Sequence, residues 1–353
     1  MPYTTMSNRS GHGPRWNERS AIPPFDLDLR RFDEWFESRG SGIAAVIRHH
    51  GETVFRRGAC ETPIGVNSVR KSFLSALVGI AIQDGQMDLN CTLEQLGFDE
   101  LPGLREEERA ASVGDLLSSR SGIYLPAPNQ KTRTDYKSLR SSPNASHWLY
   151  NERPERGAYP PGQRWFYNNW DFNVAGLLYE QLTGRSIFQA FERLVAAPIQ
   201  MQHFDPFVHG RYLYQRDFLG ATFRAPYYQF MLSADDQAAF GELYLNNGRF
   251  NGQQVIPGNW IQQSTAPLTD TGLAGLFSHY GYMWWVESAK DPERPRAITA
   301  FGARGHFIGV LPDVQAVIVL QCVDPQAADR LTEDDYSDAV ASLRQSIPTK
   351  RNL

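Results

Sequence analysis

The chain has few cysteines and no long apolar run. Cys60, Cys91 and Cys322 are its three cysteines, and their spacing fits neither a metal site nor a disulfide framework. The eight histidines form no metal-ligand pattern, so we expect no metal and no other cofactor. Its longest apolar stretches are far shorter than a membrane span, and its first residues lack the apolar region of a signal peptide. These absences predict a cytoplasmic protein without a membrane partner.

Basic residues are also few. The chain has 35 Lys and Arg residues against 39 Asp and Glu residues, and this balance offers no basic surplus for binding nucleic acid. Only 5 of the 35 basic residues are lysines. A lysine inside an apolar helix is therefore best explained by a task that arginine cannot perform, which is to lose its proton. With 353 residues, 41% of them hydrophobic, the chain can bury a full core.

One apolar stretch carries polar side chains at helical spacing. Residues 67–85 predict a buried helix that opens on a serine, and Ser68, Lys71, Ser72 and Ser75 share one face of it. We expect this face to line a cleft. The spacing places the Ser68 hydroxyl beside the Lys71 amine, which can take the hydroxyl proton once burial or a cationic neighbour lowers its pKa. Nucleophilic catalysis is the prediction, and a solvated polar face is the alternative.

A second polar group lies in an aromatic stretch before another apolar helical pattern. Tyr167, Asn168 and Asn169 follow the turn at residues 160–162 and precede a helix predicted over residues 174–182. Buried amides are unfavourable unless they are hydrogen-bonded, so these residues need partners in the fold or form part of a site.

Strand patterns lie near both ends of the chain, and helical patterns lie between them. The fold class predicted is α/β (α+β), with a mainly antiparallel sheet flanked by terminal helices and an inserted helical domain. The predicted parts are a flexible arm over 1–24, a sheet domain over 25–88 plus 268–353, and a helical insertion over 89–267. Within them we expect helices at 25–39 and 332–347, a surface loop at 129–161, and strands at 42–49, 53–56, 280–286, 297–301, 306–311 and 315–321. Thr332 and Asp335 are spaced for a capping interaction at the start of the last helix.

Together these motifs resemble the serine β-lactamase and penicillin-recognising superfamily, in its class C-like branch of esterases, D-amino-acid peptidases and 6-aminohexanoate-dimer hydrolases. The resemblance covers about residues 27–347 and rests on S-x-x-K at Ser68 and Lys71 and Y-x-N at Tyr167 and Asn169. It implies that Ser68 is the acylated nucleophile and Lys71 the assisting base. It also implies that Tyr167 passes the proton to the leaving group, with its pKa lowered by the lysine ammonium, and that Asn169 orients Lys71 or the substrate carbonyl.

The chain departs from this family at the late triad. Relatives carry K-T-G or H-x-G on a strand where this chain aligns Ala303, Arg304 and Gly305, with His306 next. Gly305 allows close backbone approach, but the cation that grips a substrate carboxylate is missing from the first position. Arg304 either replaces that cation or points to solvent. The expected oxyanion donors are the backbone N–H of Ser68 and that of the residue after the triad.

The resulting hypothesis is a serine hydrolase that acts through an acyl-enzyme on a small carboxylic ester. An ester is favoured because an alkoxide leaving group needs less protonation than an amine. An amide hydrolase or an acyltransferase is the alternative. A non-catalytic ligand-binding relative is the third reading, because Ala303 interrupts the triad. The expected partner is a small-molecule ester or amide, and the oligomeric state is left open.

Overall fold

The structure is a computed structural model that describes residues 27–100, 103–125, 127, 154–213, 224–288, 295–324, 326 and 331–347. The arm predicted over 1–24 lies outside the described residues, as does most of the loop predicted over 129–161.

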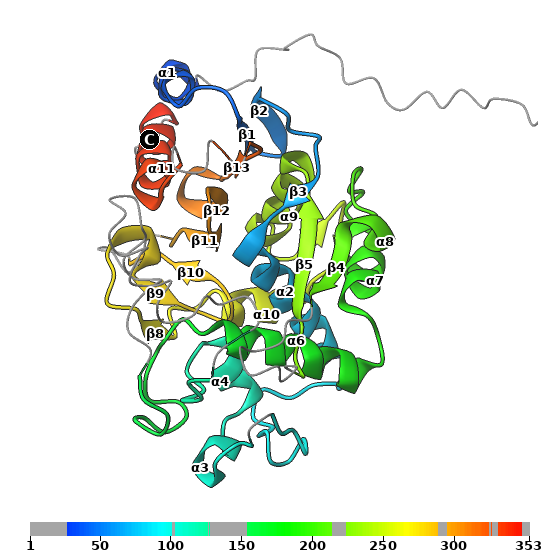
Figure 1. Cartoon of the computed structure of the whole chain (residues 1–353). Coiled ribbons are helices and arrows are strands. Elements are labelled where there is room, and N and C mark those ends of the chain that lie inside the picture. The colour runs from blue at the N-terminus through cyan, green and yellow to red at the C-terminus, as the bar shows by residue number, and fades with distance from the viewer. Residues whose placement is uncertain are drawn as a thin grey trace, which may run out of the picture.

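An antiparallel sheet of eight strands runs along the molecule from β2 to β8 (Figure 1). Its order is β2-β1-β13-β12-β11-β10-β9-β8, so the N-terminal hairpin pairs directly with the last strand of the chain. The prediction of one mainly antiparallel sheet built from both ends of the chain is confirmed. The strands are β1 (Ile43–His49), β2 (Glu52–Arg57), β8 (Thr269–Asp270), β9 (His279–Tyr280), β10 (Trp285–Val286), β11 (Ile298–Gly302), β12 (His306–Leu311) and β13 (Ala316–Cys322).

The two terminal helices, α1 (Arg30–Ser38) and α11 (Glu333–Ser346), pack together against this sheet (Figure 1). Tyr336 of α11 stacks on Phe307 of β12, with 4.4 Å between the ring centroids. At the start of α11, Thr332 and Asp335 bond each other's backbone N–H groups and form the predicted capping box. The helix predicted over 25–39 is shorter than expected, because α1 begins at Arg30.

The opposite side of the sheet is covered by α9 (Ala234–Leu245), which packs on β1, β12 and β13. A Cβ atom on Gly241 of α9 would lie 2.5 Å from Val317 Cγ1 of β13, so glycine permits this close approach. Helix α9 falls within the residues predicted as the helical insertion, and the boundary of that insertion stays a prediction. A smaller sheet of order β3-β5-β4 lies next to α9 (Figure 1). Its strands are β3 (Ile64–Gly65), β5 (Tyr227–Leu232) and β4 (Gly210–Leu213).

The central helix is α2 (Arg70–Gln83), preceded by the 3₁₀ turn η1 (Asn67–Val69). It packs against α6, α7 and α10, and a Cβ on Gly79 would lie 2.1 Å from Trp260 Cδ1. No helix in the described part of the chain is long and apolar enough to cross a membrane. The other elements are α3 (Glu106–Arg109), α4 (Val113–Leu117), α6 (Asn169–Thr183), α7 (Ile187–Phe191), the π-helical turn η3 (Glu192–Ala196), α8 (Pro206–His209), β6 (Arg249–Phe250), β7 (Gln253–Gln254), α10 (Gly258–Ser264), η4 (Gly275–Phe277) and η5 (Pro312–Val314).

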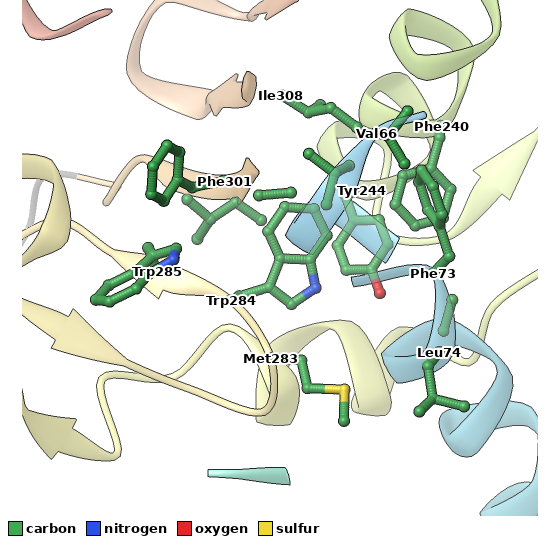
Figure 2. Packing of buried hydrophobic residues seen from close by; sticks show 14 of the residues in the cluster. Val66, Phe73, Leu74, Phe240, Tyr244, Met283, Trp284, Trp285, Phe301 and Ile308 are labelled. Atoms are coloured by element: carbon green, nitrogen blue, oxygen red, sulfur yellow. The ribbon is translucent and has the colours of Figure 1, made fainter. Parts of the chain in front are cut away.

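Buried aromatic side chains fill the space between α2 and strands β10 to β12 (Figure 2). The Trp284 ring lies 4.4 Å from that of Tyr244, between centroids. The single strand predicted over 280–286 is wrong, because β9 and β10 are short and a turn separates them. Met283 in that turn has a φ of 65°, which no strand residue adopts.

Candidate active site

Four of the predicted site residues meet at one amine. Ser68 lies in η1, one helical turn before Lys71 of α2, and the Lys71 Nζ is 2.7 Å from the Ser68 Oγ. The same Nζ is 2.7 Å from the Tyr167 hydroxyl and 2.8 Å from the Asn169 Oδ1. The Lys71 side chain is 1% exposed, whereas Ser68 is only half-buried. Ser68 and Asn169 are therefore the residues of this group that a substrate can reach, and Ser68 is the one with a nucleophilic oxygen.

Tyr167 and Asn169 are held in place by the residues between and before them. Asn168 caps α6, and its backbone N–H donates to the Ser119 Oγ at 3.0 Å. Its Nδ2 donates to the buried Asp171 Oδ1 at 2.9 Å, and the Ser121 Oγ donates to the same oxygen at 2.7 Å. Asn168 is therefore a structural residue, which answers the question that the sequence left open about this pair of amides.

Burial sets the protonation states at this amine. Burial, and then the charge of the neighbouring Arg70, lower the pKa of Lys71 well below its ordinary value. Burial raises the pKa of Tyr167 above its ordinary value, although a hydrogen bond with Ser68 opposes this effect. The expectation of a tyrosine pKa lowered by a lysine ammonium is therefore wrong. Burial instead favours the neutral form of both the Lys71 amine and the Tyr167 phenol.

A neutral amine satisfies all three of its contacts. It has two N–H donors and one lone pair, and the Asn169 Oδ1 can only accept. One N–H of Lys71 therefore points to Asn169, and the lone pair remains for a hydroxyl proton from Ser68 or Tyr167. In its neutral form, which burial favours, Lys71 can therefore accept a proton from the serine hydroxyl beside it.

The other two serines of the predicted face do not line a cleft. Ser72 and Ser75 are at most 1% exposed, and their hydroxyls donate to the backbone oxygens of Met283 at 2.8 Å and of Tyr282 at 2.7 Å. These hydrogen bonds join α2 to the turn between β9 and β10. The expectation that the polar face of this helix lines a cleft is therefore wrong for Ser72 and Ser75.

The predicted late triad is not on the strand that faces Ser68. Strand β11 ends at Gly302, and residues 303–305 form the turn to β12, in which Arg304 has a φ of 71° and Gly305 one of 83°. A Cβ on Gly302 would lie 3.2 Å from the Ser68 N and 2.3 Å from the Val66 O. The close backbone approach expected of Gly305 is therefore made by Gly302.

The other late residues lie around this turn. Ala303 accepts a hydrogen bond from the Asn67 Nδ2 at 2.6 Å, which ties the end of β11 to the turn that carries Ser68. Arg304 is exposed, and its contact with a substrate carboxylate stays a prediction. His306 is 4% exposed, and none of the hydrogen bonds among the described residues joins it to Ser68, Lys71 or Tyr167.

Gly302 is a site residue that was not predicted from the sequence, although the sequence contains a pattern that could have indicated it. The segment from Gly302 to Gly305 contains two glycines, and a three-residue hairpin connection needs positive φ angles near its end. Gly305 is explained by that turn, which leaves Gly302 for the approach to the serine.

Comparison with known proteins gives one family and one fold. The family described as Beta-lactamase matches residues 30–342. Among solved structures, the octameric penicillin-binding protein homologue from Pyrococcus abyssi is 17% identical, with a TM-score of 0.62 over 91% of this chain and 80% of that one. A beta-lactamase from Mycobacterium bovis is 16% identical, with a TM-score of 0.57 over 90% and 100% of the two chains.

A third solved structure, from Bacillus anthracis, is named as a candidate 6-aminohexanoate-dimer hydrolase. It is 18% identical, with a TM-score of 0.61 over 89% of this chain and 80% of that one. At these identities the structural matches show the fold, and they confirm the predicted fold class.

Proposed function

The chain belongs to the beta-lactamase family, whose fold is that of serine hydrolases, and from this premise we propose that it hydrolyses small carboxylic esters through an acyl-enzyme on Ser68. One observation carries the proposal. The buried amine of Lys71, with its lowered pKa, lies 2.7 Å from both the Ser68 Oγ and the Tyr167 hydroxyl. A serine next to a neutral amine is an activated nucleophile.

The proposed reaction begins when the Ser68 oxygen attacks the ester carbonyl and Lys71 takes the hydroxyl proton. The carbonyl oxygen becomes an oxyanion, and the backbone N–H groups of Ser68 and Ala303 are the proposed donors to it. Their placement is supported by the approach of Gly302 to Ser68 and by the bond from Asn67 to Ala303. Ala303 replaces the residue expected from the sequence, His306, because Gly302 rather than Gly305 approaches Ser68.

The leaving alkoxide then takes the proton of the Tyr167 hydroxyl, and the Lys71 ammonium returns a proton to that oxygen. The alcohol departs, and the acyl group remains on Ser68. Water attacks this acyl-enzyme through the same groups in reverse, and the products are a carboxylic acid and the free enzyme. Asn169, which accepts from Lys71, keeps the amine aimed at both hydroxyls.

An ester is favoured over an amide on physical grounds. An amide nitrogen must be protonated before it can leave, whereas an alkoxide departs with less help. Burial makes Tyr167 a weaker acid than an ordinary tyrosine, and this disfavours the more demanding leaving group. Amide hydrolysis is the second candidate, because one similar structure is named for cleavage of a 6-aminohexanoate dimer.

A fluorophosphonate probe and a matched ester and amide pair test the proposal. We expect the probe to label wild-type protein on Ser68 and to block hydrolysis, and Ser68→Ala to lose both labelling and turnover. The ester of a given acid should be cleaved faster than its amide. Labelling that persists in Ser68→Ala removes the proposed nucleophile. Stoichiometric labelling without turnover of any substrate indicates a ligand-binding protein instead.

A further inference from the structure

Arg70 is a buried guanidinium that no carboxylate of the described residues neutralises. Its side chain is 0% exposed, and none of the ion pairs among the described residues includes it. Its Nη2 donates to the Asn173 Oδ1 at 2.8 Å, and its Nε and Nη1 have no acceptor among the described residues. Its other close neighbours are the rings of Tyr227 and Tyr228, at 4.3 and 4.0 Å from the guanidinium carbon. A buried charge without a counter-ion is destabilising, so stability does not explain it.

The position of Arg70 suggests a different reason. It directly precedes Lys71 on α2, and the two side chains reach consecutive residues of α6. The Lys71 Nζ lies 4.5 Å from the Phe172 ring centroid, and Arg70 bonds the next residue, Asn173. Both side chains are buried at the same interface, where water screens their repulsion poorly. An arginine keeps its charge across the pH range of an assay, so this repulsion is permanent.

We propose that Arg70 is a positioning residue whose fixed positive charge keeps the Lys71 amine unprotonated, and so able to accept the Ser68 proton. The inference rests on the proposed function, because it assigns Arg70 a task only if Lys71 is the base. A catalytic lysine beside a second cation is a general way to keep an amine neutral. The charge of Arg70 also lowers the pKa of Lys71, after the larger effect of burial.

Among the described residues, Arg70 is the one charged group that lowers the pKa of Lys71. From the segment before α6 the Tyr167 hydroxyl faces Lys71. Tyr228 of β5 lies against the Arg70 guanidinium, and Tyr280 of β9 lies against the Tyr167 ring. Burial raises the pKa of each of these phenols, so all three are neutral. Asp171 of α6 is turned away, because its Oδ1 accepts hydrogen bonds from the Ser121 and Asn168 side chains.

The test is the pH profile of two rates, namely acylation of Ser68 by the fluorophosphonate and kcat/KM for an ester. Arg70→Met removes the charge and keeps a long apolar side chain. In a pH profile, the acid limb is the range in which the rate falls because Lys71 becomes protonated. We expect this limb to lie at higher pH in Arg70→Met than in wild type. At a fixed pH on the limb, the rate should fall about tenfold for each pH unit of displacement. At pH values above the displaced limb, the rate should return to within a few fold of wild type. If Arg70→Met does not fold, Arg70→Gln is measured in its place, since it can keep the bond to Asn173.

Asn173→Ala is the matched control, because it disturbs the same contact and leaves the charge of Arg70. Its acid limb should coincide with that of wild type. An unmoved limb in the Arg70 variant, a rate that falls equally at every pH, or an equal displacement in Asn173→Ala overturns the inference and leaves Ser68 as the nucleophile. Hydrolysis or labelling that survives in Ser68→Ala overturns the proposed function instead.

Discussion

Replacing Tyr167 by phenylalanine separates a proton relay from aromatic packing. The Tyr167 ring stacks on Trp285, with 5.4 Å between centroids, and lies 5.2 Å from the ring of Phe172. Phenylalanine keeps these contacts and removes only the hydroxyl that lies 2.7 Å from the Lys71 Nζ. The unfolding free energy should therefore fall by about 0.5–1.5 kcal/mol, the net worth of one hydrogen bond.

The expected effect on catalysis is larger. A lost general acid lowers kcat by about 10²–10⁴-fold, which corresponds to about 3–5 kcal/mol of activation free energy. Burial keeps the Tyr167 phenol protonated, so this loss should hold across the neutral pH range. It should be larger for alkyl esters and amides than for p-nitrophenyl acetate, whose leaving group departs without a proton.

The assay is steady-state kinetics of wild type and Tyr167→Phe on one alkyl ester and on p-nitrophenyl acetate, together with urea unfolding of both proteins. An equal loss on the two substrates indicates distorted geometry, because only the unactivated ester needs the phenol proton. A folded variant with unchanged kcat on the alkyl ester refutes the role of Tyr167.

The other predictions concern Lys71, Ser72 and His306. Lys71→Arg should be nearly as inactive as Lys71→Ala, because arginine cannot accept the Ser68 proton, and wild-type kcat in the arginine variant would remove Lys71 as the base. Ser72→Ala should lower the unfolding free energy by about 1–3 kcal/mol, because it leaves the buried Met283 backbone oxygen without its donor. Fluorophosphonate should label this variant at the wild-type rate. Slower labelling of a stable Ser72→Ala protein would contradict a purely structural role. Burial, and then the charge of Arg304, lower the pKa of His306 from 6.5 to about 4, so between these pH values the unfolded chain binds a proton that the folded one excludes. Stability should therefore rise with pH through this window by at most about 3 kcal/mol, and His306→Gln should flatten the rise in urea unfolding.

Local sequence patterns predicted much of the fold. The alternation of apolar residues gave the hairpin of β1 and β2 and the strands β12 and β13, each to within about one residue. The spacing of Thr332 and Asp335 marked the start of α11. These features depend on neighbours in the chain, and a single sequence carries them directly.

The features that the sequence did not predict depend on distant contacts. The partners of Ser72 and Ser75 are carbonyls more than 200 positions away, so a polar helix face looked the same whether it met solvent or a buried turn. Which glycine approaches Ser68, Gly302 or Gly305, depends on the register of β11 on β12, and the sequence does not show that register. The protonation of Tyr167 depends on whether burial or a nearby charge has the larger effect, and only the packed structure decides this.

Hydrolysis through the proposed acyl-enzyme requires Ser68 to carry the acyl group. Its most direct test is mass spectrometry of protein quenched seconds after mixing with a p-nitrophenyl ester, followed by peptide mapping. We expect one acyl group per chain, located on Ser68, present in Ser72→Ala and absent in Ser68→Ala. An acyl group on any other residue, or one that persists in Ser68→Ala, would contradict it.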